Sequence, residues 1–223
     1  MHTNKILKAE NFARERHEGQ FRKGLAAEPY TVHLEEVVAF VEAEGGAEDA
    51  ICAAWLHDTV EDCPPTSFAD IDHHFGPEVA SIVRELTDDK NLPKSERKQL
   101  QVINAAKKSH TACLVKIADK TSNLNSLAKS PPADWSYERR SEYVIWAATV
   151  VNALAFKPEG ALKRFLIALD QAEIANAENC LTTRQAQGVA LNVLARKAQR
   201  AGASSESISH FLAKFLETSL EKR

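Results

Sequence analysis

The chain has 223 residues, of which 44% are hydrophobic and 26% are charged. This balance is typical of a folded globular protein and excludes a largely disordered, collagen-like or fibrous chain. The formal net charge of -3 argues against nucleic acid as a partner, because binding to a phosphate backbone requires an excess of basic residues.

Signals for membrane insertion and secretion are missing from the sequence. No apolar run reaches the ~20 residues that a spanning helix needs. The first residues, MHTNK, lack the apolar region of a signal peptide. The four cysteines have no CxxC spacing, which favours small hydrophobic side chains over a zinc or redox site. We therefore expect a cytoplasmic protein with no membrane partner.

In chain order, the predicted elements are all helices. The spacing of apolar residues predicts helices over residues 6–20, 31–43, 48–58, 94–109, 111–128, 136–156, 158–179, 184–201 and 205–222. Two short helices flank Gly76, with Thr66 or Ser67 capping the first and Pro77 beginning the second. No segment reads as a paired strand. The prediction is an all-α protein with one domain over residues 1–157 and a helical extension over residues 158–223.

Two adjacent residues of metal-ligand type, His57 and Asp58, end a strongly apolar helix. Neighbouring helical residues point about 100° apart, so these two can share an ion only near the helix end. Glu61 and Asp62 follow them at i+4 spacing, and a helix that continued for one more turn would place both carboxylates beside the pair. Burying four such groups is costly unless a cation compensates for them.

His33, at a helix start, and Asp119, inside an apolar helix, could complete a metal site. Two histidines and two aspartates give mixed nitrogen and oxygen ligation, which suits Mn²⁺ with open octahedral positions better than a closed tetrahedral zinc site. The alternative is that the His-Asp pair arose by chance and that His33 merely caps a helix. The pattern favours the metal.

These residues stand in segments that resemble the HD-domain hydrolases of the RelA/SpoT group, most closely the single-domain small alarmone hydrolases of the metazoan SpoT-homologue type. The matching segments, between residues 16 and 151, are RHEGQFRKG, EPYTVHLEEVV, AAWLHDTVEDC, FGPEVASIVRELTDD, VKIADKTSNLNSL and WSYERRSEYVIWAATVV. The resemblance implies that the predicted domain is an HD-type helical bundle with a metal-dependent hydrolase site.

Position by position, the resemblance also implies the roles of the site residues. The ligands of one Mn²⁺ ion per chain would be His33, His57, Asp58 and Asp119. The catalytic pair would be Glu61 and Asp62. The residues in contact with the nucleotide would be Arg22, Lys23, Asn123 and Tyr143.

The implied activity is removal of the 3′-pyrophosphate from guanosine tetra- and pentaphosphate, the alarmones of the stringent response. A divalent ion suits this reaction because it lowers the pKa of bound water and polarises a phosphoryl oxygen. Glu61 could then deprotonate the water while Asp62 protonates the departing sugar oxygen, or the two roles could be reversed.

Three alternatives stay open at this point. Two are enzymes that use the same site, an NADPH 2′-phosphatase and a hydrolase of adenosine alarmones. The third is a helical module that senses such nucleotides without turnover, and the intact pair Glu61 and Asp62 argues against it.

The chain also departs from the family pattern. The GLAA loop is about two residues longer than usual, and Leu34 stands where many relatives have proline. Thr121 and Ser122 replace a pair that is more often large and apolar or aromatic, which predicts a more open wall near Asn123. These departures bear on the substrate more than on the chemistry.

Residues after about 180 lie outside the resemblance. Their apolar stripe predicts packing on the domain or on a second copy of the chain, as a homodimer. The stripe comprises Ile208, Phe211, Leu212, Phe215 and Leu216.

Overall fold

This computed structural model describes residues 3–210, and its regular secondary structure consists of helices. In chain order they are α1 (Asn4–Arg16), α2 (Tyr30–Ala43), α3 (Glu48–Leu56), α4 (Thr59–Asp62), α5 (Phe68–Phe75), α6 (Pro77–Leu86), α7 (Lys94–Ala105), α8 (His110–Lys129), α9 (Tyr137–Ala153), α10 (Glu159–Cys180) and α11 (Thr183–Arg200). A short helical segment over residues 205–210 follows. Within the described range, strand pairing is limited to one isolated bridge between Phe21 and Pro29. The all-α prediction is confirmed.

The predicted helix starts around Gly76 are confirmed. The Ser67 hydroxyl accepts a hydrogen bond from the Asp70 N–H, and the Asp70 carboxylate accepts one from the Ser67 N–H, which makes a capping box at the start of α5. Pro77 is the first residue of α6, where its missing N–H costs nothing. Gly76 joins the two helices with a φ of +88°, a conformation that favours glycine.

One predicted helix is interrupted at His57 and Asp58, the adjacent pair of candidate metal ligands. The sequence predicts a helix through Asp58, whereas α3 ends at Leu56 and α4 begins at Thr59. The His57 ring nitrogen Nδ1 lies 2.8 Å from the Ala54 carbonyl oxygen. In a continuing helix that oxygen would accept the Asp58 N–H. The side chain of His57 therefore takes over a backbone bond, and His57 and Asp58 form the turn between two helices.

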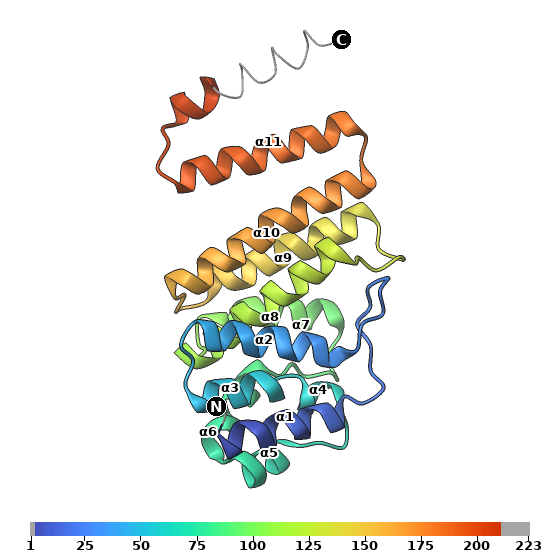
Figure 1. Cartoon of the computed structure of the whole chain (residues 1–223), viewed down its shortest axis with the longest axis vertical. Helices are drawn as coiled ribbons and strands as arrows, with labels where there is room; N and C mark the ends of the chain where they lie inside the picture. Colours follow the sequence, from blue (N-terminus) through green and yellow to red (C-terminus); the bar gives the residue numbers. More distant parts are fainter. Residues whose placement is uncertain (1–2, 211–223) are drawn as a thin grey trace.

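The helices form a stack in which α8 is central (Figure 1). Helices α1, α3, α5 and α6 occupy one end of the stack, α9 and α10 lie on the other side of α8, and α11 lies beyond α10. Helix α8 packs against α2, α9 and α10, and it is buried over most of its length. A helix that is buried all round is normally apolar. Helix α8 instead buries three charged side chains, Lys116, Asp119 and Lys120.

Helix α10 shares the main hydrophobic core. Its side chains Phe165 and Leu169 belong to the same buried cluster as Leu34 of α2 and Leu124 of α8. Helix α11 packs in turn on α10, where Arg200 pairs with the buried Asp170. The apolar stripe predicted beyond α11 lies outside the described residues, apart from Ile208.

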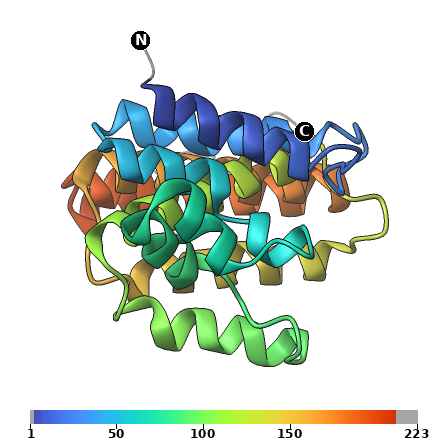
Figure 2. The same cartoon turned by 90° about the horizontal axis from the view of Figure 1, so that it is seen from below.

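Helix α7 runs along one edge of the molecule, joined to the rest by extended segments (Figure 2). It packs on α9, where the Trp146 ring N–H donates to the Lys98 carbonyl oxygen at 3.1 Å. The segment over residues 87–93, between α6 and α7, is thereby held beside α4. This segment supplies partners for the two candidate catalytic acids.

The loop that carries Arg22 and Lys23 is fixed to the end of α8. Gly24 lies so close to Ser130 that an added Cβ would collide with the Ser130 carbonyl oxygen. The Ala26 N–H donates to the Ser130 hydroxyl at 2.7 Å. A larger residue at position 24 would push the loop, and with it Arg22, away from α8.

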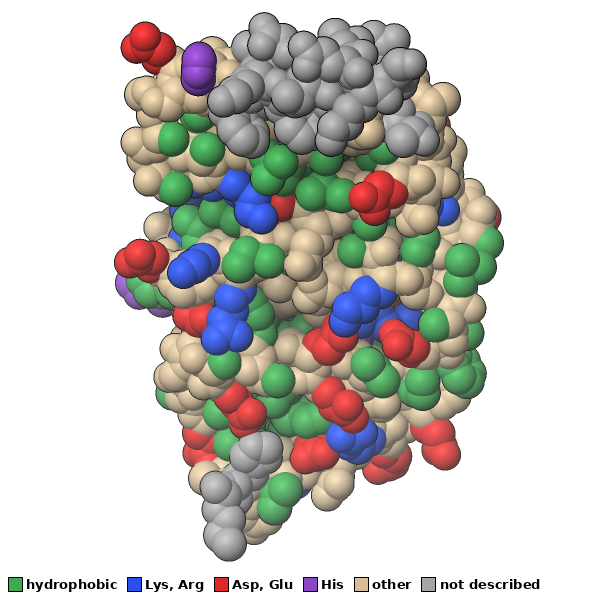
Figure 3. Space-filling view, turned by 45° about the horizontal axis from the view of Figure 1, so that its top comes forward, with side chains coloured by type: hydrophobic (Ala, Val, Ile, Leu, Met, Phe, Trp, Pro, Cys, Tyr) green, Lys and Arg blue, Asp and Glu red, His purple; other side chains and the backbone are tan. Residues whose placement is uncertain are grey.

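The described helices include none with the length and hydropathy needed to cross a bilayer. On the face shown in Figure 3, the described acidic and basic side chains are interspersed. This distribution agrees with the small net charge.

Candidate active site

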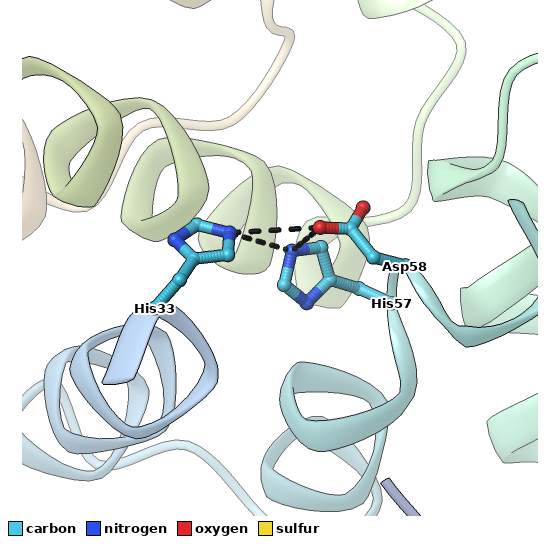
Figure 4. Close-up of side chains that lie close together, drawn as sticks. All are labelled: His33, His57 and Asp58. Carbon is cyan, nitrogen blue, oxygen red and sulfur yellow. Dashed lines mark hydrogen bonds and ion pairs between the residues drawn. The ribbon is translucent and has the colours of Figure 1, made fainter. Parts of the chain in front are cut away.

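His33, His57 and Asp58 bring three ligand atoms to one point between α2 and the turn after α3 (Figure 4). His33 Nε2 lies 3.3 Å from His57 Nε2 and 3.6 Å from Asp58 Oδ2. His57 Nε2 lies 3.1 Å from the same oxygen. All three atoms are close enough together to contact one ion, as the sequence predicts.

The other ring nitrogen of each histidine is held by a hydrogen bond. His57 Nδ1 faces the Ala54 carbonyl, which can only accept, so Nδ1 carries the proton and Nε2 of the neutral ring carries a lone pair. His33 Nδ1 lies 2.7 Å from the Ser122 hydroxyl. Metal-bound histidines are typically oriented by such a bond at the second nitrogen.

The electrostatics of the cluster also fit a cation. Burial lowers the pKa of His33. Burial would lower that of His57 too, but the Asp58 carboxylate beside it outweighs this effect and raises the pKa of His57 to about 9. Without a metal, a proton on His57 therefore balances the Asp58 charge. A divalent ion between the two Nε2 atoms and the carboxylate would replace that proton.

Asp119 approaches the cluster from α8. Its Oδ1 lies 3.7 Å from His33 Nε2 and accepts a hydrogen bond from the Asn123 amide at 2.6 Å. Its Oδ2 lies 3.2 Å from Lys120 Nζ and 3.7 Å from Lys116 Nζ. Burial would raise the pKa of Asp119, but the two lysines hold it well below its usual range. Asp119 is thus an ionised oxygen donor at the edge of the cluster.

Tyr30 contacts the site, although the sequence did not single it out. Its hydroxyl donates to Asp58 Oδ2 at 2.6 Å, and its ring stacks on His17 with centroids 4.9 Å apart. Tyr30 precedes His33 by three residues on α2, so both side chains lie on one helix face. That spacing is the signal that could have found it.

The two candidate catalytic acids lie on α4, one turn beyond Asp58. Glu61 accepts a hydrogen bond from the Asp88 N–H at 3.0 Å and lies 3.5 Å from Arg97 Nη1. Burial raises the pKa of Glu61. Asp62 pairs with Lys90. Neither acid belongs to the three-residue cluster.

The four candidate nucleotide residues differ in their placement. Arg22 is buried, and its guanidinium faces Glu36, Ser122 and Asn123, whereas Lys23 is exposed.

Tyr143 is half-buried, with ring contacts to Trp135 and Trp146. Burial raises the pKa of the Tyr143 hydroxyl well above its usual value, so it stays protonated and can donate.

Four basic side chains, from the loop after α1, from α7 and from α9, lie near enough that three of them repel the fourth, Lys94, and we call this group the cationic rim. They are Lys23, Lys94, Arg97 and Arg139. Burial and then repulsion from the other three lower the pKa of Lys94. Lys94 and Arg97 are three residues apart on α7, but the other two come from a loop and from α9, so the sequence alone could not show that all four gather. Arg97 joins it to Glu61.

A cavity of about 380 Å³ adjoins the site, and its wall includes Asp88, Arg97 and Lys116. The first two contact Glu61, and the third contacts Asp119. The hollow therefore shares side chains with both the candidate catalytic acid and the candidate ligand on α8.

Comparison with known proteins agrees with this geometry. The family described as HD domain matches residues 9–149. The guanosine-3′,5′-bis(diphosphate) 3′-pyrophosphohydrolase MESH1 of Xenopus tropicalis is 48% identical over 151 residues, which are 67% of this chain and 84% of the relative. The human MESH1 is 45% identical over 151 residues, with the same shares.

The fold of this chain is also similar to that of a solved structure. It is described as "A metazoan ortholog of SpoT hydrolyzes ppGpp and plays a role in starvation responses". The superposition has a TM-score of 0.72 at 39% identity and covers 76% of this chain and 96% of that one. The part of this chain left over is an addition to the shared fold.

Proposed function

We propose that this chain removes the 3′-pyrophosphate from guanosine 3′,5′-bis(diphosphate) and from guanosine pentaphosphate. The chain belongs to the HD-domain family and, within it, to the MESH1-type hydrolases. The observation that carries the proposal is the convergence of His33, His57 and Asp58 next to a pair of carboxylates. The chain is an enzyme, because its relatives are named as hydrolases and it keeps the HD domain. A module that only senses nucleotides is therefore set aside.

The metal that we propose is one Mn²⁺ ion per chain, held by His33, His57, Asp58 and Asp119. Two imidazole nitrogens and carboxylate oxygens suit an ion of intermediate softness with octahedral preference. When bound, such an ion lowers the pKa of water and stabilises charge on a phosphoryl oxygen.

The chain's own acids carry the proton transfers in this proposal. Glu61 accepts a proton from the attacking water, and its raised pKa suits a proton acceptor near neutral pH. The water oxygen forms a bond to the phosphorus while the bond from phosphorus to the sugar 3′-oxygen breaks. Asp62 passes a proton to that departing oxygen, and it must first take up this proton from solvent, because in the structure its carboxylate pairs with Lys90. The products are pyrophosphate and guanosine 5′-diphosphate, or the 5′-triphosphate from the pentaphosphate, each with a free 3′-hydroxyl.

The substrate is bound through its charge and its base. The cationic rim faces the phosphates, with Lys23 supplying a flexible point charge. Asn123 and the Tyr143 hydroxyl supply hydrogen-bonding groups for the nucleoside. Arg22 supports the substrate-binding residues without contacting the phosphates, because its guanidinium already donates hydrogen bonds to Glu36 and to the Ser122 carbonyl.

Three further parts of the proposal concern the whole chain. We keep residues 1–157 as the catalytic domain and residues 158–223 as an extension, although α10 shares the domain's core. Pairing of two chains through the C-terminal helices stays a prediction. A cytoplasmic location is supported by Cys52, Cys63 and Cys113, which are buried as free thiols.

The test is product analysis with the purified full chain and Mn²⁺. We expect stoichiometric pyrophosphate from guanosine 3′,5′-bis(diphosphate), and release slowed at least about 100-fold after Glu61→Gln. A matched control is Glu78→Gln, which changes an exposed glutamate on α6. Release of inorganic phosphate from NADPH at a higher kcat/KM, or turnover only of adenosine alarmones, would replace guanosine as the substrate class.

A further inference from the structure

A continuous hydrogen-bonded chain runs from a candidate metal ligand to the nucleotide side of the site. His33 Nδ1 lies 2.7 Å from Ser122 Oγ, and Ser122 Oγ lies 2.6 Å from Glu36 Oε2. Arg22 Nη1 donates to the same glutamate oxygen at 3.0 Å and to Ser122 Oγ at 3.2 Å. The four residues come from the loop after α1, from α2 and from α8.

The chemistry of these groups sets the direction of each bond. An ionised carboxylate only accepts, so the single hydroxyl proton of Ser122 points to Glu36. A guanidinium only donates, so Arg22 cannot accept from Ser122. The Ser122 oxygen is then left to accept a proton from His33 Nδ1. In the neutral ring, the lone pair of His33 lies on Nε2, which faces His57 and Asp58.

We propose that Ser122 and Glu36 are positioning residues that fix His33 in the tautomer a metal needs, and that Arg22 ties this pair to the nucleotide pocket. The proposal rests on the metal site of the proposed function. It assigns Arg22 a task other than direct contact with phosphate.

Burial makes this arrangement specific. Ser122 is 3% exposed and Arg22 is 8% exposed, so water offers them few competing hydrogen bonds. Arg22 Nη2 also donates to the Ser122 carbonyl at 3.2 Å and lies 3.4 Å from Asn123 Oδ1. Asn123 in turn donates to Asp119. One guanidinium thus supports the groups that orient two of the four candidate ligands.

The experiment compares Glu36→Ala with Glu36→Gln. The Glu36 side chain is 36% exposed, so neither change should prevent folding. Alanine leaves the Ser122 proton without its acceptor, and the hydroxyl can then donate to His33 Nδ1 and move the ring proton to Nε2. Glutamine keeps an acceptor oxygen for Ser122. We expect Mn²⁺ affinity to fall about 10–100-fold for Glu36→Ala and to stay near wild type for Glu36→Gln.

Ser122→Ala should weaken Mn²⁺ binding to a similar degree, and Ser122→Thr, which keeps the hydroxyl, should restore it. The matched control is Glu35→Ala, because Glu35 pairs with Arg14 instead. Affinity is read from the electron spin resonance signal of free Mn²⁺ during titration. Long-range ¹H–¹⁵N spectra of the metal-free protein report the tautomer, with Nδ1–H of His33 expected in wild type.

Wild-type Mn²⁺ affinity in both Glu36→Ala and Ser122→Ala would overturn the proposal, while leaving the proposed function intact. Equal losses in Glu36→Ala and Glu36→Gln would also overturn it, because charge rather than hydrogen-bond direction would then be responsible. If the wild-type chain binds no Mn²⁺, the proposed function fails. The tautomer spectra still decide the positioning role in that case.

Discussion

Two buried aspartates show how the catalytic core differs from the C-terminal layer. Asp119 on α8 is 6% exposed and Asp170 on α10 is 2% exposed, and each lies beside two basic side chains. The partners of Asp170, Arg196 and Arg200, come from α11 and carry permanent charge. They join one helix to its neighbour.

The surroundings of Asp119 are different in kind. Besides its lysines, it faces the Nε2 atom of His33, a group whose lone pair also needs a partner. The chain itself supplies the basic partners of Asp170, whereas in the proposed function a cation would complete the cluster around His33 and Asp58. A buried acid therefore indicates a functional site only when its carboxylate oxygens and neighbouring acceptor atoms point at one another with no donor between them.

The largest expected effect separates the two regions directly. Asp58→Ala removes the one carboxylate that contacts both histidines, so we expect loss of bound Mn²⁺ and of hydrolysis below detection. Asp170→Asn should retain both. Metal content of the purified variants and pyrophosphate release measure this. Asp72→Asn, an exposed change on α5, is the control, and full activity in Asp58→Ala would remove the site from the account.

The next prediction distinguishes, within the catalytic core, the residues that bind the metal from those that transfer protons. Glu61→Gln should reduce kcat by about 10²–10⁴-fold, because the amide cannot accept the proton from water. Mn²⁺ affinity should be unchanged, since Glu61 is held by Asp88 and Arg97 outside the cluster. Steady-state kinetics and a Mn²⁺ titration on the same sample give both numbers. Loss of metal together with activity would make Glu61 a ligand instead.

On the C-terminal side, the expected effect is on stability. Asp170→Asn should lower the free energy of unfolding by about 2–3 kcal/mol, because Arg200 loses its charged partner. This loss in the free energy of unfolding is smaller than for a fully buried ion pair, since the arginines are partly exposed to solvent. Urea denaturation measures the loss. A decrease in kcat at temperatures where the variant is folded would show that the two regions are coupled.

A further effect is a pH dependence confined to the core. His57 has a raised pKa of about 9, so below that pH Mn²⁺ must displace a proton. Apparent affinity should therefore rise about tenfold per pH unit between pH 7 and 9 and then level off.

In the metal-free protein, the same raised pKa of His57 contributes stability that is present in full below pH 6.5, the ordinary pKa of histidine, and is lost as the pH rises through about 9. Affinity that is flat with pH, measured by titration in matched ionic strength, would contradict this assignment.

Much of the fold could be predicted because it depends on local patterns. Helical spacing, Ser67 and Pro77 located the helices and their starts. The break at Leu56 could not be predicted, because it depends on a side chain, His57, that bonds to the backbone.

In the site, residue type and the family motifs pointed to His33, His57 and Asp58, which the structure brings together. Ser122 entered only as a departure expected to open the wall near Asn123. In the structure it is buried and hydrogen-bonded to His33, and the more open wall stays a prediction. Its role, like those of Glu36 and Lys90, depends on contacts between distant segments, which a single sequence does not reveal.

The most direct test of the account is a crystal of the full chain grown with Mn²⁺ and measured for anomalous scattering from manganese. We predict one peak per chain, within bonding distance of His33 Nε2, His57 Nε2 and the carboxylates of Asp58 and Asp119. A well-ordered structure with no peak there, or with manganese only at another position, would contradict the central claim.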